Sequence, residues 1–153
     1  RVFPDAKIIF SLRDPRDVIL SCYQQRFGMN AAMAQFLELN SAAAYYDAIM
    51  RLMQLCEEKL AFDLHRIRYE DVVADMKGVA RALTQFLDVP FEPSMLDFRN
   101  TALKRDINTP SARQVIEPLY NRSVERWRRY AEELGPALPV LNAWAMRFGY
   151  AAD

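Results

Sequence analysis

The chain has 153 residues, which is close to the length of one ordinary domain. Apolar residues make up 52% and charged residues 26%, a composition that excludes a disordered or fibrous protein. No apolar run approaches the ~20 residues of a membrane-spanning helix, so we expect no such segment. The 20 basic and 20 acidic residues predict no nucleic-acid partner, and one His and two Cys exclude a His/Cys zinc cluster and a disulfide framework.

The first part of the chain is typical of a strand followed by a helix. Residues 7–12 form a nearly continuous apolar run, which favours a strand covered on both faces. Asp14 is a good N-cap and Pro15 a good first helical residue. We expect the helix to run to about Phe27 and to end at Gly28.

The middle of the chain predicts a long helical crossover. A short helix is expected at 31–38, and Ser41 is expected to cap a helix that runs to about Leu60. Its inward stripe is expected to be Tyr45, Ile49, Leu52, Cys56 and Leu60. Residues 63–69 indicate a second strand, which the crossover would pair in parallel with the first. A helix at 76–88 is expected next.

The last third is predicted from its breakers and caps. A short helix is expected at 93–98, and 99–121 is expected to be extended loop because it lacks periodicity and contains prolines. Ser123 is expected to cap a helix that runs to about Leu134. Gly135 and Pro136 should stop that helix, and a final helix is expected at 137–148.

These elements predict a helix-rich α/β chain with about two parallel strands. Two strands do not make a self-contained α/β sheet. We therefore expect residues 1–153 to form a single partial domain, the C-terminal portion of a three-layer fold whose first strands lie upstream.

The strongest chemical feature is an arginine at the end of the first strand. Arg13 lies at the sheet edge where ligands of α/β folds bind, next to a helix N-terminus that favours anions. A guanidinium can hold a phosphate bidentately, and Ser21 lies about 9 Å further along the helix, at ~1.5 Å per residue. The alternative is that Arg13 pairs with Asp14 or Asp17 and that Ser21 is an ordinary surface residue.

The segment FPDAKIIFSLRDPRDVILSCYQQRF resembles the 3′-phosphate-binding segment of sulfotransferases that use 3′-phosphoadenosine 5′-phosphosulfate (PAPS). This resemblance implies a P-loop-type fold in which Arg13 and Ser21 bind the 3′-phosphate. The segment RIRYEDVVAD is similar to the family's strand-end Tyr-Glu-Asp segment, which implies that Tyr69 contacts adenine. The alternative for Tyr69 is a half-buried core residue.

The segment TPSARQVIEPLYNRSVERWRRY resembles the nucleotide clamp of tyrosylprotein sulfotransferases, and still more that of bacterial proteins joining tetratricopeptide repeats to a sulfotransferase domain. The resemblance implies that Ser111 touches both the nucleotide and the transferring sulfonate. The further nucleotide contacts that it implies are Gln114, Val115, Ile116, Pro118, Tyr120 and Arg126. Residues 99–129 hold eight Lys/Arg against three Asp/Glu, a net charge of +5 that suits such a ligand. For Trp127 the alternative is core packing, and for Arg122, Arg128 and Arg129 it is a solvated face.

The sequence departs from the family pattern at several points. Tyrosylprotein enzymes have an arginine where Gln25 stands, and the Arg-Lys-Gly run of cytosolic enzymes is absent. No Gly-rich 5′-phosphosulfate loop occurs, and we expect that loop and the general base upstream. His65 lies within the second strand, and we interpret it as structural.

The resemblance implies that the parent protein transfers a sulfonate from PAPS to an acceptor hydroxyl or amine, leaving adenosine 3′,5′-bisphosphate. We expect no metal and no nucleic-acid partner, and the 153 residues alone to be inactive. Two alternatives stay open, another truncated P-loop phosphotransferase and a non-catalytic helical interaction module. Low cysteine use favours a reducing, cytoplasmic compartment; the sequence gives neither the acceptor nor the oligomeric state.

Overall fold

The computed structural model describes residues 5–103 and 121–151, except for the side chains of Arg99 and Thr101. The chain divides into two compact units. One unit comprises residues 1–12 and 62–121, and the other comprises residues 13–61 and 122–153. Ser111, Gln114, Val115, Ile116, Pro118 and Tyr120 lie outside the described residues.

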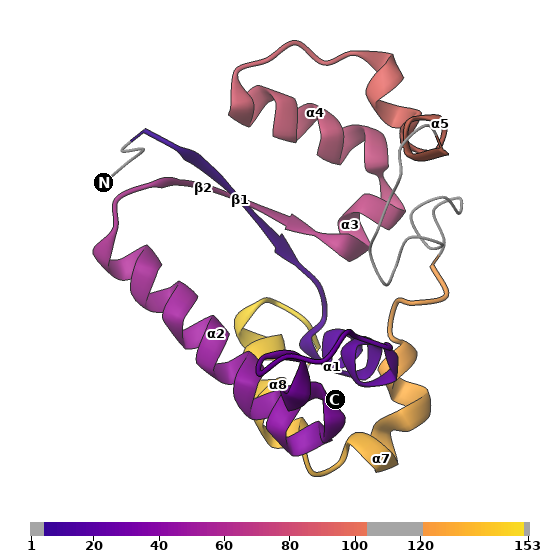
Figure 1. Ribbon diagram of the computed structural model, residues 1–153. Coiled ribbons are helices and arrows are strands. Elements are labelled where there is room, and N and C mark those ends of the chain that lie inside the picture. The colour runs from indigo at the N-terminus through magenta and orange to yellow at the C-terminus, as the bar shows by residue number, and fades with distance from the viewer. Residues whose placement is uncertain (1–4, 104–120, 152–153) are drawn as a thin grey trace. The chain divides into compact units, whose positions relative to one another are not determined.

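The first unit contains a parallel pair of strands (Figure 1). β1 (Lys7–Leu12) pairs with β2 (Asp63–Arg68) in a register that runs from Lys7 opposite Asp63 to Leu12 opposite Arg68. The predicted strands and their parallel pairing are therefore confirmed. The chain leaves both strands at the same edge.

Helices follow β2 in the first unit. They are α3 (Tyr69–Ala74), α4 (Met76–Leu87), the 3₁₀ helix η2 (Pro93–Leu96) and α5 (Phe98–Leu103). The expectation of extended loop from residue 99 is wrong up to Leu103, because the turn that begins at Phe98 continues as α5. His65 of β2 stacks on Phe86 of α4 with ring centroids 5.0 Å apart, and Lys7 Nζ donates to the Phe86 carbonyl at 2.6 Å.

The apolar strand β1 is more open than the sequence predicts. Ile8 and Ile9 point to opposite faces of the sheet, since successive strand residues alternate, and both are exposed. The prediction that this strand is covered on both faces is therefore wrong for the described residues. Leu12, at the carboxyl end of the strand, is buried.

Helix α4 has a well-defined cap at each end. The Asp75 carboxylate accepts a hydrogen bond from the Gly78 amide at 2.9 Å, and Asp88 ends the helix in the left-handed region at φ 63°. A left-handed backbone strains a residue with a Cβ atom, whereas glycine adopts it without that cost.

We predict that Asp88→Gly stabilises the chain by about 0.5–1 kcal/mol, because it relieves this strain. Urea unfolding followed by circular dichroism measures the change. Asp97→Gly is the control, since Asp97 has a negative φ of −91° and gains nothing from glycine. A stability gain for Asp97→Gly equal to that for Asp88→Gly would contradict the explanation.

The second unit is helical and contains a continuous buried core. Its elements are α1 (Pro15–Gln24), the 3₁₀ helix η1 (Met33–Leu37), α2 (Leu39–Lys59), the 3₁₀ helix η3 (Arg126–Tyr130), α7 (Ala131–Leu134) and α8 (Leu138–Arg147). The core brings together Ile19 of α1, Tyr46 of α2, Trp127 of η3 and Leu141 of α8. No described helix has the length and apolarity needed to cross a membrane.

Two helix ends differ from the sequence prediction. Helix α1 stops at Gln24, because Gln25 turns into extended backbone while its amide donates to the Cys22 carbonyl at 3.1 Å. Gly28 is therefore not its cap. Helix α2 begins before Ser41, because the 3₁₀ turn η1 leads directly into it and the Ala42 amide already bonds the Glu38 carbonyl.

The inward face of α2 also differs from the predicted stripe. Ala42, Ala43 and Tyr46 of its first half are buried, whereas Ile49, Leu52 and Leu60 are exposed. The buried residues lie on a neighbouring face of the helix and not on the predicted stripe, because helical periodicity does not show which apolar face meets the core of this unit.

Candidate functional site

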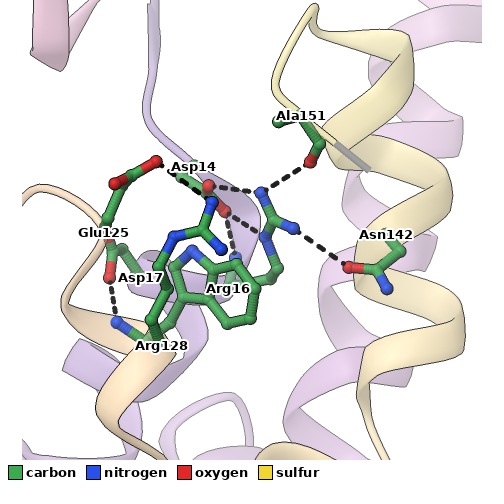
Figure 2. Close-up of polar contacts among 8 residues, drawn as sticks. Asp14, Arg16, Asp17, Glu125, Arg128, Asn142 and Ala151 are labelled. Carbon is green, nitrogen blue, oxygen red and sulfur yellow. Dashed lines mark hydrogen bonds and ion pairs between the residues drawn. The ribbon is translucent and has the colours of Figure 1, made fainter. Parts of the chain in front are cut away.

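The start of α1 is fixed by a buried ion pair (Figure 2). Asp14 caps the helix by accepting from the Arg16 amide at 2.9 Å, which confirms the predicted N-cap. The Arg16 guanidinium binds the same carboxylate through Nε at 2.9 Å and Nη2 at 2.7 Å. Both side chains are almost fully buried, so the pair is a structural feature of the motif that contains Arg13.

Arg16 joins α1 to the last part of the chain. Its Nη2 donates to the Ala151 carbonyl at 3.0 Å and its Nη1 donates to Asn142 Oδ1 at 3.3 Å (Figure 2). Its guanidinium also lies 4.0 Å from the centroid of the Trp127 ring. Trp127 is 3% exposed, in agreement with the core interpretation. Cation–π stacking gives a second reason why a tryptophan stands at this position, because a buried guanidinium needs partners on its face as well as at its edges.

The segment after Ser123 is not the continuous helix that the sequence predicts. In a helix begun at Ser123, the Trp127 amide would donate to the Ser123 carbonyl. Here the Trp127 amide donates instead to Asp17 Oδ1 at 2.7 Å, and the Ser123 carbonyl accepts from Arg13 Nη2 at 2.8 Å. We call these four residues the α1 clip. In the α1 clip, the donor and the acceptor of one helical hydrogen bond bind the side chains of Asp17 and Arg13 instead of each other. Glu125, which lies between Ser123 and Trp127, has a left-handed backbone with φ 53°.

Arg13 lies half-buried beside α1, directly after β1. Burial raises the pKa of the Cys22 thiol, and the positive charge of Arg13 opposes that increase. The same charge acts on Asp17. The Ser123 carbonyl accepts from Arg13 Nη2, so the guanidinium lies beside the segment 123–127.

Ser21 lies on the helix face that carries the α1 clip. Asp17, Ser21 and Gln24 are four and three residues apart, a spacing that places them on one face of α1. Asp17 binds the Trp127 amide, and Gln24 Oε1 accepts from Arg126 Nη2 at 2.7 Å. The half-buried Ser21 is therefore bracketed by two contacts to the segment 123–127.

The structure thus brings three of the predicted site residues, Arg13, Ser21 and Arg126, to the border between α1 and residues 123–127. Tyr69 is the first residue of α3, half-buried, and belongs to the other unit. Arg128 is exposed, bonds Glu125 at 3.2 Å and stacks on Trp127, in agreement with a solvated position. Among the described residues, no group of His, Cys, Asp and Glu side chains is arranged to hold a metal ion.

Sequence reasoning missed Asp17 and Ser123 as parts of this site. The available signal was the spacing of Asp17, four residues after Arg13 and four before Ser21, which puts its carboxylate on the Ser21 face. Ser123 contributes its backbone carbonyl, which every residue type has, so the sequence gives no sign of this contact.

Comparison with known proteins identifies the family of the chain. The profile described as "Sulfotransferase family" matches residues 1–93, more than half of the chain. The chain belongs to the sulfotransferase family. Both strands, α1 and the Arg13–Ser21 segment lie within the matched residues.

Two relatives match the chain over more residues than the family profile does. An uncharacterized protein of Aquifex aeolicus (strain VF5) is 30% identical over 142 residues, which are 92% of this chain and 18% of the relative. Protein-tyrosine sulfotransferase A of Caenorhabditis elegans is 24% identical over 135 residues, which are 82% of this chain and 34% of the relative. The chain therefore spans only a minor part of the length of either relative.

A buried carboxylate in the α1 clip gives the sulfotransferase chain a pH-dependent stability. Burial raises the pKa of Asp17 from 3.8 to about 6, while the hydrogen bond from the Trp127 amide and the charge of Arg13 oppose the increase and nearby Asp14 adds to it. The folded chain therefore binds this proton more tightly than the unfolded chain does. The stability that the folded chain gains from binding this proton is complete below about pH 4 and is lost as the pH rises through about 6.

We predict that Asp17→Asn, which keeps an oxygen acceptor but removes the charge, gains stability relative to the wild type between pH 4 and pH 7. The gain amounts to as much as about 2–3 kcal/mol, at about 1.4 kcal/mol per pKa unit. Urea unfolding of both proteins at pH 4.5 and 7.5 measures it. A difference that is constant with pH would show that Asp17 titrates normally.

Proposed function

We propose that this chain holds the 3′-phosphoadenosine part of PAPS within a longer sulfotransferase. The observation that carries the proposal is Arg13: a half-buried guanidinium at a strand end, next to the start of α1 and braced by the Ser123 carbonyl. Family membership supplies the reaction class. The identity of the nucleotide and of the sulfonate acceptor belongs to the proposal.

The chemistry of the side chains suits a phosphate. A guanidinium donates paired, charge-assisted hydrogen bonds to phosphate oxygens, and a serine hydroxyl donates one more. Arg126, held at the far end of the same border by Gln24, adds a second cation. Half-burial strengthens these interactions, because the local dielectric is lower than that of water.

Adenine is the proposed partner of Tyr69. Leu12 pairs with Arg68, so the chain leaves β1 at Arg13 and leaves β2 at Tyr69, with the two strands ending level. Ligands of parallel α/β sheets bind at the carboxyl ends of the strands. A half-buried tyrosine there offers a ring face for stacking and a hydroxyl for hydrogen bonding.

The remaining contacts stay predictions. Ser111, Gln114, Val115, Pro118 and Tyr120 would form the clamp over the nucleotide, with Ser111 donating to the transferring sulfonate. In the reaction of the longer protein, the acceptor loses its proton to a general base as its oxygen or nitrogen attacks sulfur. The bond from sulfur to the phosphate oxygen breaks, and adenosine 3′,5′-bisphosphate leaves.

A competition titration tests the proposal. We expect adenosine 3′,5′-bisphosphate to raise the melting temperature of the chain and to displace a fluorescent analogue at concentrations where ATP does not. Preference for ATP would indicate a phosphotransferase. No thermal shift with any nucleotide would indicate an interaction module, and either result would overturn the proposal.

The acceptor is proposed as a hydroxyl or an amine. The relative from Caenorhabditis elegans is named for protein tyrosine as its acceptor. Gln25 departs from the arginine of tyrosylprotein enzymes, so a tyrosine peptide is one acceptor to test among several. Transfer of labelled sulfonate to peptide, sugar and phenol acceptors by the longer protein distinguishes them.

A further inference from the structure

The α1 clip has an unusual bonding pattern that calls for a reason. Ser123 and Trp127 are four residues apart, the spacing of an α-helical hydrogen bond, and the chain continues as the 3₁₀ helix η3 and then as α7. Nothing in the residue types of 123–127 prevents helix, yet the bond is not made. Its two ends are satisfied by side chains of Arg13 and Asp17 instead.

These two side chains have opposite charges and stand four residues apart. Asp17 is 1% exposed, and its Oδ1 lies 2.7 Å from the Trp127 nitrogen. Arg13 Nη2 lies 2.8 Å from the Ser123 oxygen. An anion receives the backbone donor and a cation gives to the backbone acceptor, so each contact is charge-assisted and stronger than the neutral helical bond that it replaces.

The consequence reaches Arg13. As long as Asp17 occupies the Trp127 amide, the Ser123 carbonyl is kept from its helical partner and stays on the Arg13 guanidinium. If Asp17 is removed, the Trp127 amide turns back to the Ser123 carbonyl, the helix starts earlier, and the guanidinium loses its brace. The same rearrangement shifts Arg126, which lies between them and bonds Gln24.

We propose that Asp17 is a positioning residue: by holding residues 123–127 out of the helix, it fixes the Arg13 guanidinium for the 3′-phosphate of the nucleotide. The inference rests on the proposed function and deepens it. Asp17 does not touch the nucleotide. It acts through the Trp127 amide and the Ser123 carbonyl.

The test compares Asp17→Ala with Asp17→Asn in the chain. We expect Asp17→Ala to bind adenosine 3′,5′-bisphosphate about 10-fold more weakly, the scale of one lost charge-assisted contact. Affinity for adenosine 5′-phosphate, which lacks the 3′-phosphate, should stay unchanged. Asp17→Asn keeps the oxygen acceptor and should restore most of the affinity.

Hydrogen exchange supplies an independent readout. The Trp127 amide should be protected in the wild type and in Asp17→Asn. In Asp17→Ala the new bond to the Ser123 carbonyl should keep it protected, and loss of its protection would show that the helix does not start earlier. Glu125→Asn is the matched control, because it changes an exposed residue of the same segment to one that tolerates the left-handed backbone. It should leave both nucleotide affinities as they are.

The outcomes separate the two proposals. Equal affinity of the wild type for both nucleotides would overturn the proposed function and this inference with it. A wild-type preference for the 3′-phosphate that survives in Asp17→Ala would overturn the inference alone. If Asp17→Ala does not fold, Asp17→Asn alone tests the inference. A Trp127 amide that stays protected in Asp17→Asn while the preference for the 3′-phosphate is lost would overturn the inference.

Discussion

Replacing Arg16 with methionine is expected to destabilise the chain by about 3–5 kcal/mol, the usual cost of breaking a buried ion pair from one side. The substitution removes the cation that compensates the buried Asp14 carboxylate. It also removes the hydrogen bonds to Asn142 and Ala151 and the stack on Trp127. Urea unfolding measures the loss of stability. A variant without a cooperative unfolding transition would have lost its folded state, which is the largest form of the same effect.

Arg51→Ala is the matched control for this prediction. Its ion pair with Asp47 has the same length, 2.7 Å, but the Arg51 side chain is 72% exposed. An exposed pair contributes far less than a buried one is expected to, because water already solvates both charges. Equal losses for the two variants would show that burial does not govern the strength of the Arg16 pair.

A double variant isolates the cause. Asp14→Asn combined with Arg16→Met removes both charges, so no buried carboxylate is left to be compensated. We expect the double variant to be more stable than Arg16→Met alone, since the largest penalty is the uncompensated charge. Additive losses would assign the effect to packing against Trp127 instead.

Local signals of the sequence predicted those parts of the fold that depend on nearby residues. The apolar run of β1, the Asp14 cap and the extent of α4 follow from neighbours within one or two turns. The parallel pairing followed from the length of the crossover. In each case the deciding interactions are short-range, so the residue pattern carries them.

The segment after Ser123 shows why other parts were out of reach. Its caps and apolar spacing favour one helix, but two side chains 110 residues away take the donor and the acceptor of its first bond. The error at 123–127 therefore comes from long-range contacts that overrule local preference. The error in α2 has a different cause, because periodicity identifies an apolar face but not which face the core covers.

The candidate site follows the same division. Arg13 and Ser21 were predicted from the resemblance of residues 3–27 to a 3′-phosphate-binding segment, and their guanidinium and hydroxyl groups are usual ligands of a phosphate. From residue types and spacing alone, pairing of Arg13 with Asp14 or Asp17 stayed open. The parts that hold them, the Asp17 carboxylate and the Ser123 carbonyl, became visible only through the hydrogen bonds. The sequence thus named the groups proposed to meet the ligand, and the structure added their supports.

Replacing Arg13 with alanine is expected to weaken binding of adenosine 3′,5′-bisphosphate about 100-fold, since charge-assisted bonds to a phosphate contribute about 1.5–3 kcal/mol. Arg13→Lys keeps the charge but loses the forked geometry, so an intermediate loss is expected. Arg26→Ala is the control, because Arg26 is exposed and lies beyond the end of α1. Calorimetric titration with adenosine 3′,5′-bisphosphate and adenosine 5′-phosphate measures each affinity.

A double-mutant cycle with Ser21→Ala decides whether the two side chains share one phosphate. If the guanidinium and the hydroxyl bind the same group, the phosphate shifts when either is lost, and the two losses do not add. We expect a coupling of about 0.5–3 kcal/mol for adenosine 3′,5′-bisphosphate and none for adenosine 5′-phosphate. Purely additive losses, or equal losses for both nucleotides, would place Arg13 and Ser21 at different parts of the ligand and leave the 3′-phosphate without its proposed site.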